Sequence, residues 1–365
     1  MKKILILSNL ISYTYNFRKE IIEAFIKLGH MVTIVADLDD EQKTEFFTAK
    51  GCRMIHIPFN GKGTSIKQDA AVLTAYLRIM RKEKPDVVFS YTIKPNLYGG
   101  IAAKLLDKTY IPMITGLGEV EKKGKLQILL LAMHHFVMPR ARCVFFQNQD
   151  NINFFEEHHI KTQKVVLLPG SGINLKEHEY EEYPIEKNGI VFGFVGRLTK
   201  AKGIEQYLDA AEYFAKESKK LYFHVAGKCD EQFEQRVKQL HEQGVIIYHG
   251  QLGDTREFYK QIHCLILPTY HPEGISNVLL ESNACGRPVI CTNRTGCKEV
   301  VENGVNGLYC KARDSQNLIS VVKTFCNLTW EEKRALGING RRKIVDNFSR
   351  EIVVAQYMKI MEEVS

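Results

Sequence analysis

The stretch from Pro268 to Glu281 reads Pro-Thr-Tyr-His-Pro-Glu-Gly-Ile-Ser-Asn-Val-Leu-Leu-Glu, and it decides the fold. A short apolar run at 264–267 precedes it, and a second at 288–291 follows Gly286. Each run is typical of a buried parallel strand, and the segment between them predicts a turn and then a helix that ends at glycine. This order places the turn at the carboxyl edge of an open α/β sheet, where such sheets bind ligands.

The turn and the start of this helix carry groups that suit a ligand with phosphate and hydroxyl groups. Glu273 lies in the predicted turn, and Glu281 lies two turns along the helix. Carboxylates accept hydrogen bonds from hydroxyls, and unpaired amides at a helix start bind anions. We expect four backbone amides to open the helix: those of Gly274, Ile275, Ser276 and Asn277. The pattern indicates a nucleotide sugar.

The composition is that of an ordinary globular protein. A chain of 365 residues, 45% hydrophobic and 25% charged, is long enough for two domains. The net charge of +8 favours anionic partners, but no basic block predicts a nucleic-acid contact. The nine cysteines include no C-x-x-C pair, which indicates reduced thiols. With no signal-peptide core and no membrane-spanning run, we expect a cytoplasmic protein.

Apolar strands alternate with helical segments along most of the chain, which predicts two doubly wound parallel sheets. A polar loop is expected at 8–16, and no G-x-G-x-x-G follows the first strand, so a dinucleotide-dependent redox function loses its main support. The predicted strands are 3–7, 31–36, 53–58, 86–91, 110–115, 143–147, 165–168, 190–196, 221–225, 245–248, 264–267, 288–291 and 308–310. The predicted helices are 17–28, 66–83, 96–106, 124–138, 149–158, 204–217, 231–242, 254–262, a short one near 297–302 and a helical tail with a capping box at Thr329 and Glu332. The predicted domains are 1–172 and 189–346, with a linker at 173–188 and a C-terminal helix at 347–365 that packs back toward the first domain.

A second polar segment ends a strand of the same predicted sheet as Glu273. It reads Gly-Arg-Leu-Thr-Lys-Ala-Lys-Gly from Gly196 to Gly203. Arg197 offers a planar fork of donors to phosphate oxygens, and Lys202 offers a point charge. A solvated basic loop explains this segment alone equally well. Its place at the same sheet edge as Glu273 favours a diphosphate site.

At this point the chain resembles the retaining glycosyltransferases of family four, which have the two-domain GT-B fold. The second half carries their pattern in order: G-R-x-x-x-x-K-G at 196–203, V-A-G at 225–227, H-G-Q-L at 249–252, the E-x7-E spacing from Glu273 to Glu281, and G-x-P-V-I at 286–290. The spacing of two glutamates is common by itself. In register with the other segments, it makes the resemblance specific over nearly the full length.

The resemblance implies roles for individual residues. Arg197 and Lys202 would neutralise the donor diphosphate and the charge that grows on it. Glu273 would contact donor-sugar hydroxyls, Glu281 would hold the ribose, and the strand-end glycine Gly196 would belong to the donor site. Gln251 and Leu252 would pack on the base. The family uses cations and helix starts where other enzymes use a metal, so no metal and no cofactor are expected.

The first half resembles, more narrowly, bacterial enzymes that extend a sugar already attached to polyprenyl diphosphate. The likeness rests on Y-N-F-R at 15–18, S-Y-T-I-K-P-N at 90–96, T-G-L-G at 115–118 and F-F-Q-N at 145–148. One departure is that the first loop lacks the family's glycines, so Asn16 and Arg18 would contact phosphate with their side chains instead. Ordinary capping or surface roles remain open for each acceptor candidate: Asn16, Arg18, Lys94, Asn96, Gly116 and Gly118.

Three other features have simple explanations. Cations flank an apolar segment within 122–142, which suits either a membrane-surface helix near a lipid acceptor or an amphipathic core helix. His134 and His135 are adjacent and point to different faces of a helix, so they make a poor metal pair. The three cysteines at 285, 291 and 297 fall on a helix, a strand and a loop, which argues against a shared metal.

We therefore expect a retaining glycosyltransferase with a UDP-sugar donor and a lipid-diphosphate-linked sugar acceptor in capsule, O-antigen or protein-glycan assembly. It would transfer a hexose, an N-acetylhexosamine or a uronic acid, with peripheral contact at the inner membrane face. Closure of the two domains around the cleft would exclude water. Two rivals remain: a nucleotide-sugar epimerase on the same scaffold, and a non-catalytic subunit that binds nucleotide sugars. The epimerase would convert the donor without an acceptor, and docking alone would not require Arg197, Lys202, Glu273 and Glu281 together.

Overall fold

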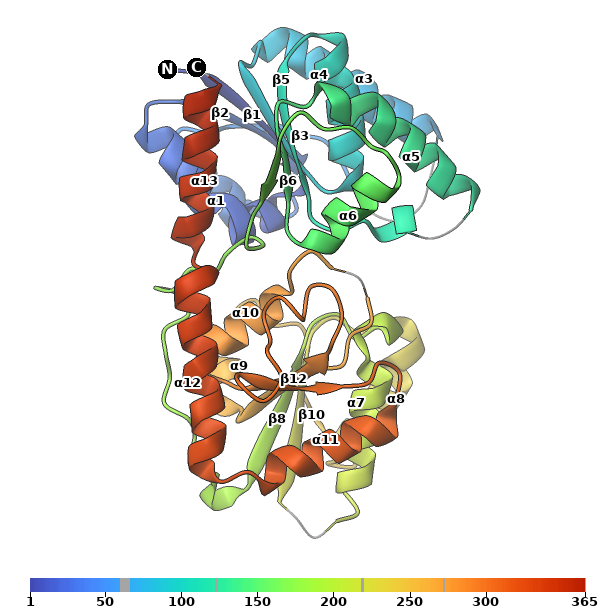
Figure 1. Ribbon diagram of the computed structural model, residues 1–365, viewed down its shortest axis with the longest axis vertical. Helices are drawn as coiled ribbons and strands as arrows, with labels where there is room; N and C mark the ends of the chain where they lie inside the picture. Colours follow the sequence, from blue (N-terminus) through green and yellow to red (C-terminus); the bar gives the residue numbers. More distant parts are fainter. Residues whose placement is uncertain (60–65, 122–123, 218–219, 272, 365) are drawn as a thin grey trace. The chain divides into compact units, whose positions relative to one another are not determined.

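The computed structural model describes residues 1–59, 66–121, 124–217, 220–271 and 273–364 (Figure 1). Its internal contacts divide the chain into two compact units. Unit 1 contains Met1–Ser171 together with Arg350–Ser365, and unit 2 contains Gly172–Ser349. The C-terminal helix is therefore part of the first unit. Among the described residues, no helix has both the length and the apolar character that crossing a membrane requires.

Unit 1 is built on a seven-stranded sheet in which every pairing is parallel. The order is β3-β2-β1-β4-β5-β6-β7. The order reverses between β1 and β4, which is the topological switch point at which doubly wound sheets bind ligands. The strands are β1 (Lys3–Leu10), β2 (Met31–Asp37), β3 (Arg53–His56), β4 (Val87–Tyr91), β5 (Thr109–Ile114), β6 (Val144–Phe146) and β7 (Val165–Leu167).

Helices cover both faces of this sheet, and alternate residues of each strand decide which face they join. Ile4 and Ile6 pack in one core, whereas Leu5 and Leu7 pack in the other. The first core includes side chains of α1 (Ile11–Lys27), α2 (Glu41–Ala49) and α13 (Arg350–Glu363). The second includes side chains of α3 (Ile66–Glu83), α4 (Gly100–Leu105), α5 (Lys125–Val137) and α6 (Gln149–Glu157), and Figure 1 shows α3, α4 and α5 together on that side.

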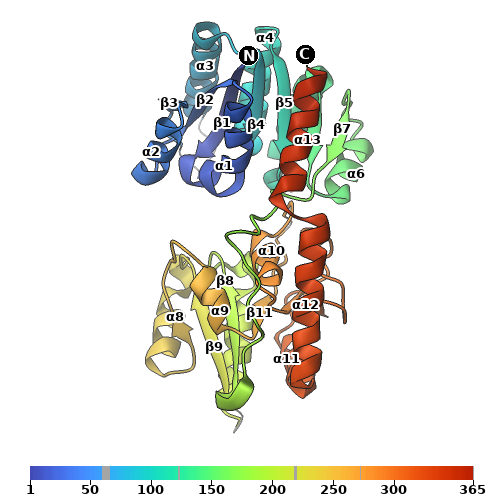
Figure 2. The same ribbon diagram turned by 90° about the vertical axis from the view of Figure 1, so that its left-hand side faces the viewer.

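Unit 2 repeats the arrangement with a six-stranded parallel sheet ordered β10-β9-β8-β11-β12-β13. Its switch point lies between β8 and β11. The strands are β8 (Ile190–Val195), β9 (Leu221–Ala226), β10 (Ile247–Tyr248), β11 (Cys264–Leu267), β12 (Val289–Thr292) and β13 (Gly307–Cys310). The helices are α7 (Ile204–Phe214), α8 (Glu231–Glu242), α9 (Arg256–Gln261), α10 (Asn277–Ala284), α11 (Ser315–Asn327) and α12 (Trp330–Asn347) (Figure 2). The prediction of two doubly wound parallel sheets is confirmed.

Residues 173–188, expected as a linker, lie against α12 within unit 2. The indole nitrogen of Trp330 donates to the carbonyl of Pro184 at 3.0 Å, and Arg341 donates to the carbonyl of His178 at 2.7 Å. The predicted capping box is present at the start of α12. This segment therefore has fixed partners along its length.

Three local predictions were wrong. Residues 8–16 are not a polar loop, because β1 runs to Leu10 and α1 begins at Ile11, whose side chain is fully buried. Ser8 and Asn9 instead lie in β1, and Thr14 is buried in the first turn of α1. Helix α2 was missed, although Asp40 caps it by accepting from the amide of Lys43 at 3.1 Å. The segment near 297–302, expected as a short helix, is a series of turns. At its end the amide of Glu302 donates to the side-chain oxygen of Asn306 at 2.7 Å.

Candidate functional site

The candidate site of unit 2 lies at its switch point, where β8 and β11 run side by side. Cys264 pairs with Phe192 and Leu265 with Gly193, so both strands end at the same edge. The segment after β8, residues 196–203, is called the basic loop here. The segment after β11, residues 268–271 and 273–276, is called the glutamate loop. The sequence prediction that these two segments share one edge is confirmed by the pairing.

One backbone carbonyl ties the two loops together. The oxygen of Ala201, in the basic loop, accepts from the amides of Tyr270 at 2.9 Å and His271 at 3.2 Å, and from the hydroxyl of Thr269 at 3.2 Å. Gly203 permits this approach, because its φ is +79° and a Cβ there would overlap the carbonyl of Pro268. Gly203 is therefore needed for the close packing of the two loops. Its predicted position at the start of a helix did not indicate this role.

The structure joins two of the three predicted catalytic residues directly. The ammonium of Lys202 forms an ion pair with the carboxylate of Glu273, and both side chains are mostly buried, 14% and 18% exposed. Arg197 is exposed, and among the described residues its side chain has no hydrogen bond or ion pair. Lys200 is 64% exposed and pairs with Glu205 at 3.8 Å. The basic loop thus turns Lys202 inward and leaves Arg197 and Lys200 at the surface.

A third loop, which the sequence reasoning missed, completes this edge. It follows β12, and its Gly296 accepts from the amide of Ser276 at 2.9 Å. Gly296 also packs so closely on Glu273 that a Cβ there would lie 3.0 Å from the Glu273 Cβ. The hydroxyl of Thr292 bonds the carbonyl of Thr269. The available signal was the polar run after the apolar strand at 288–291, because that strand ends at the same edge.

The expectation that Gly274 to Asn277 open the helix was wrong in its detail. Helix α10 begins at Asn277, with Ser276 as its N-cap in an extended conformation. Because the Ser276 amide bonds the Gly296 carbonyl, it is not an unpaired donor. Gly274 and Ile275 are buried in the glutamate loop before the helix, and Asn277 is half-buried. These residues adjoin Glu273, but their amides do not form one helical cradle.

Glu281 is held in place by two hydroxyl donors that sequence reasoning did not identify. Its Oε2 accepts from the phenol of Tyr259 at 2.8 Å and from the hydroxyl of Thr255 at 3.2 Å. Burial, which removes hydration from the charged form, raises the pKa of the Glu281 carboxyl above its ordinary value. An ionised carboxylate with limited hydration suits acceptance of further hydroxyl donors.

The loops after β9 and β10 meet the basic loop from the other side. Gly227 has φ +139°, and a Cβ there would overlap the carbonyl of Gly196, so only glycine fits. Its amide donates to the carbonyl of Gly250 at 2.7 Å. Beyond Gly250, Gln251 is exposed and Leu252 packs partly buried on the core of unit 2. The matched segments V-A-G and H-G-Q-L therefore lie next to Gly196.

In unit 1, two of the six acceptor candidates are buried at the carboxyl end of β5. Arg18 lies with its guanidinium 4.5 Å from the ring centre of Tyr91 and donates to the sulfur of Met113 at 2.9 Å. Asn96 accepts from the hydroxyl of Ser90 at 2.7 Å and donates to the carbonyl of Met113 at 2.8 Å. Both side chains meet at Met113, beside the switch point between β1 and β4, and their polar atoms bind largely within the protein.

The other four candidates are more accessible. Asn16 is exposed on α1, and Lys94 pairs with Asp69 of α3 at 3.0 Å. Gly116 and Gly118 lie half-buried in the turn after β5. All six candidates follow β1, β4 or β5 in the sequence. Their role in acceptor binding stays a prediction.

The part of the chain that the structure describes contains no cluster of metal-ligating side chains. There, no group of three or more His, Cys, Asp or Glu residues could hold an ion. His134 is buried, whereas its neighbour His135 is exposed. None of the nine cysteines forms a disulfide, and seven of them are buried.

Two parallel α/β units, with cations and carboxylates at a switch point of the second, are the arrangement of the GT-B fold. Solved structures of this class share the fold. The protein HepE of Anabaena, in complex with UDP and glucose, is 17% identical with a TM-score of 0.80, and both chains are covered fully. Sucrose-phosphate synthase of Thermosynechococcus elongatus is 17% identical with a TM-score of 0.77, over 100% of this chain and 99% of that one.

Two family profiles match nearly the whole chain between them. The profile of glycosyl transferases group 1 matches residues 176–343, and that of glycosyl transferase 4-like proteins matches residues 3–148. The chain belongs to these glycosyltransferase families. The resemblance that the sequence motifs carried is confirmed.

Curated relatives match along most of their length at low identity. The N,N'-diacetylbacillosaminyl-diphospho-undecaprenol alpha-1,3-N-acetylgalactosaminyltransferase of Campylobacter jejuni is 23% identical over 96% of both chains. The capsular polysaccharide biosynthesis glycosyltransferase CapM of Staphylococcus aureus is 25% identical over 78% of both chains. The UDP-Gal:alpha-D-GlcNAc-diphosphoundecaprenol alpha-1,3-galactosyltransferase of Escherichia coli is 22% identical over 86% of this chain and 82% of its own.

Proposed function

We propose that this glycosyltransferase moves a hexose, an N-acetylhexosamine or a uronic acid from a UDP-sugar to a lipid-diphosphate-linked sugar, with retention of configuration. The acceptor would be an intermediate of bacterial surface polysaccharide or glycan assembly. The relatives from Campylobacter jejuni and Escherichia coli support this acceptor class, since their names specify sugars on undecaprenyl diphosphate. The structure of HepE with UDP and glucose supports the donor class.

One observation carries the proposal: Lys202 and Glu273 are paired at the switch point of unit 2, and Arg197 is exposed on the same loop. Breaking a bond between a sugar and a diphosphate leaves negative charge on the phosphate oxygens. Cations already fixed in place stabilise that charge without reorganising at the moment of reaction. In this proposal Lys202 and Arg197 take the diphosphate, which frees one carboxylate oxygen of Glu273 for the donor sugar.

Glu281 would bind the ribose hydroxyls of the same donor. Its carboxylate is oriented by Tyr259 and Thr255, which hold one oxygen. A carboxylate that is already oriented loses little conformational freedom when the ligand binds. It therefore increases the affinity and fixes the position of the ribose. Gln251 and Leu252 would contact the base. The cations would replace a metal, and no cofactor is part of the proposal.

A reconstituted transfer reaction tests the proposal. Purified protein is incubated with a panel of UDP-sugars and a synthetic lipid-diphosphate sugar acceptor, with and without a chelator, and the products are read by mass. We expect one extended acceptor, unchanged turnover in the chelator, and a product whose anomeric configuration by NMR matches that of the donor. An inverted product would contradict retention, and loss of turnover in the chelator would contradict metal independence.

The same reaction without acceptor separates the rivals. An epimerase would convert the UDP-sugar alone, and the altered sugar would appear with no acceptor present. A binding subunit would retain the donor in a direct binding measurement and turn nothing over under any acceptor condition. Either result would contradict transfer. In our proposal the enzyme works in the cytoplasm, which suits its nine cysteines, since none of them forms a disulfide.

A further inference from the structure

Arg287 is a buried cation that lies just beyond the helix containing Glu281. It follows Gly286, past the end of α10, and is 1% exposed. In the described part of the chain, no carboxylate forms an ion pair with it. Burial, which removes hydration from the charged form, lowers the pKa of its guanidinium below the ordinary value. A buried charge costs stability unless hydrogen bonds within the protein satisfy it.

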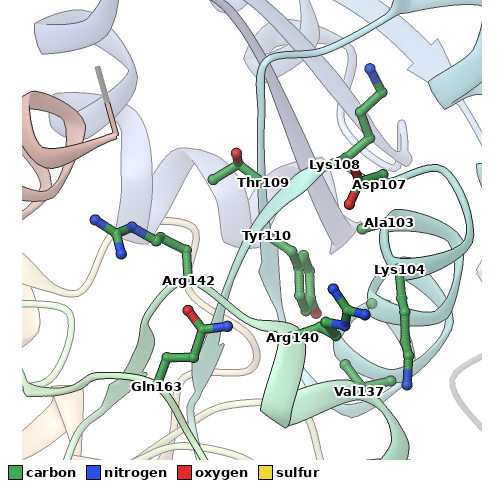
Figure 3. A pocket seen from close by; sticks show the side chains of 11 residues that line it. Ala103, Lys104, Asp107, Lys108, Thr109, Tyr110, Val137, Arg140, Arg142 and Gln163 are labelled. Atoms are coloured by element: carbon green, nitrogen blue, oxygen red, sulfur yellow. The ribbon is translucent and has the colours of Figure 1, made fainter.

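Two other cations that bind backbone carbonyls keep their access to water. Figure 3 shows Lys104 and Arg142 among the side chains that line a pocket of unit 1. Lys104 donates to the carbonyl of Phe136 at 2.7 Å, and Arg142 donates to that of Glu363 at 3.3 Å. Lys104 is half-buried and Arg142 is exposed, so water hydrates both charges. Arg287 lacks this hydration, and its partners within the protein replace it.

The guanidinium of Arg287 binds three backbone carbonyls. Its Nε donates to the carbonyl of Tyr259 at 2.9 Å, and its Nη2 donates to that of Lys260 at 3.5 Å. Its Nη1 donates to the carbonyl of Glu181, in segment 173–188, at 2.8 Å. Tyr259 and Lys260 belong to the last turn of α9, whose carbonyls have no partner within the helix. Arg287 therefore completes the C-terminal end of α9, where a cation also complements the helix dipole.

Helix α9 depends on such contacts, because it has only six residues. A helix of this length is not stable by itself in water. Its N-cap residue Thr255 and its buried Tyr259 are the two donors that hold Glu281, at 3.2 and 2.8 Å from the Oε2 atom. The position of α9 therefore decides how the Glu281 carboxylate is oriented.

The backbone of Arg287 is fixed to α10 at the residue next to Glu281. Its amide donates to the carbonyl of Ser282 at 2.9 Å, and its carbonyl accepts from the Ser282 hydroxyl at 3.3 Å. Ser282 is fully buried. Together with Glu281 and Tyr259, these two residues form a closed ring of contacts. Through this ring, Arg287 fixes α9 against α10 at the point where Glu281 receives its two hydroxyl donors.

We propose that Arg287 is a positioning residue for donor binding: it fixes α9 so that Glu281 presents its second carboxylate oxygen to the ribose of the UDP-sugar. This role rests on the proposed function, to which the ribose contact of Glu281 belongs. Arginine suits the task better than lysine, because its rigid planar fork reaches several carbonyls in fixed directions, whereas an ammonium is a point charge. Arg287 is buried and does not touch the donor, so its effect is on the affinity for UDP.

Titration calorimetry with UDP tests this role without any acceptor. Arg287→Lys keeps the charge and removes the fork. It should raise the Kd for UDP about fivefold or more, a coupling typical of residues in one hydrogen-bond network. In the transfer reaction it should raise the KM for the UDP-sugar and leave kcat within about twofold, because an interaction made equally in the ground and transition states affects KM alone. Binding is measured below the unfolding transition, so that only folded protein is counted.

A double-mutant cycle shows whether Arg287 acts through Glu281. In a Glu281→Ala background, Arg287→Lys should change the Kd for UDP by less than about twofold, since the carboxylate that α9 orients is gone. Tyr259→Phe deletes the hydroxyl that joins α9 to Glu281 and keeps the ring, so it should weaken UDP binding by the same route. If Arg287→Lys does not fold, Arg287→Gln, which keeps two amide donors, takes its place in the cycle.

Arg341→Lys is the matched control. Arg341 is half-buried and donates to the carbonyls of His178, in segment 173–188, and Ala284, at the end of α10, at 2.7 and 2.8 Å. Among the described residues it makes no hydrogen bond to α9. Its replacement should lower the stability of unit 2, because it weakens these hydrogen bonds, and Trp330 fluorescence in urea measures this loss. The Kd for UDP should not change.

Three results would overturn the proposal. The first is a folded Arg287 variant that binds UDP as tightly as the wild type. The second is an equal loss of affinity with and without Glu281, or in Arg341→Lys, which would make Arg287 a general support of unit 2. The third is a fall in kcat at constant KM. If the wild-type chain does not bind UDP, the proposed donor fails as well, and this result is distinct from a lack of effect in the variants.

Discussion

At the scale of single residues, the basic loop contains a built-in comparison. Lys202 is mostly buried and paired with Glu273, whereas Lys200, two residues away, is exposed and pairs with Glu205 at the surface. An exposed ion pair contributes little, and a preorganised buried cation contributes much more to a charged transition state. The sequence alone does not distinguish the two lysines, but their environments in the structure differ.

Replacing Lys202, which points inward, or Arg197, which is exposed, should impair the reaction of the UDP-sugar donor. Arg197→Ala and Lys202→Ala are each expected to raise the KM for the UDP-sugar and to lower kcat, the latter by about 10²-fold or more, because charge on the departing diphosphate goes unneutralised. Steady-state kinetics checks both parameters. Lys200→Ala is the control and should leave both unchanged. Unaltered kinetics in the Arg197 and Lys202 variants would remove the diphosphate role.

Glu273→Gln keeps the shape of the side chain and removes its charge. We expect transfer to fall by about 10²-fold or more, because the donor sugar loses an ionic acceptor and Lys202 loses its partner. The variant should keep the fold, as circular dichroism would show. Glu205→Gln is the matched control from the exposed pair of the same region. A Glu273→Gln enzyme with wild-type turnover would place the glutamate outside the reaction.

Glu281 links stability to pH through its raised pKa. Because the folded-state pKa lies above the unfolded one, the contribution of Glu281 to stability is full below the unfolded pKa and is lost as pH rises through the folded one. Glu281→Gln should therefore raise Tm at pH 7, by about 2–4 °C per kcal/mol recovered, and this difference should shrink as pH falls toward the unfolded pKa. Calorimetry across pH checks this expectation.

The same Glu281→Gln protein should bind the UDP-sugar more weakly, since an amide accepts hydroxyl hydrogen bonds less strongly than a carboxylate. A gain in stability with a loss of affinity is the signature of a group retained for binding. A variant that gains Tm and keeps full affinity would instead show that Glu281 does not contact the donor.

At the scale of elements, three loops at one sheet edge depend on each other. The basic loop, the glutamate loop and the loop after β12 are joined through the carbonyls of Ala201 and Gly296. Periodicity placed the strands well, because buried strands are recognisable as apolar runs. The contacts between loops were not predictable, since each pairs groups that are about 20 or more residues apart.

Gly203→Ala tests how far loop geometry supports the site. We expect a loss of about 1–3 kcal/mol in the free energy of unfolding, because alanine is strained at positive φ and its Cβ would overlap the Pro268 carbonyl. Trp330 is the one tryptophan of the chain and lies in unit 2, so its fluorescence in urea reports on that unit. Gly253→Ala, which meets nothing within 4 Å, is the control and should have no effect.

At the scale of the whole molecule, the chain leaves unit 1 after Ser171 and returns to it at Arg350. Helix α13 then packs beside α1, as Figure 2 shows. Its Tyr357 is fully buried, with ring centres 4.7 Å from Phe145 and 5.3 Å from Phe89. The last helix of the sequence therefore fills the core of the first unit.

Tyr357→Ala should destabilise unit 1 by about 3–5 kcal/mol, since it opens a large cavity among aromatic rings. We expect circular dichroism to show part of the chain unfolding at lower urea, while the Trp330 signal of unit 2 keeps its midpoint. Tyr222→Ala, at a side chain that is 43% exposed, is the control. A shift of both signals together would show that the two units unfold as one.

The sequence by itself determined the alternation of strands and helices, the two parallel sheets and the residues at the carboxyl edge of unit 2. These follow from local apolar runs and from the rule that parallel strands end at one edge. Only the tertiary structure decided that Lys202 pairs with Glu273, that the Ala201 carbonyl joins two loops, and that Arg287 binds the end of α9. Such contacts depend on the approach of distant segments, and no local pattern encodes that approach.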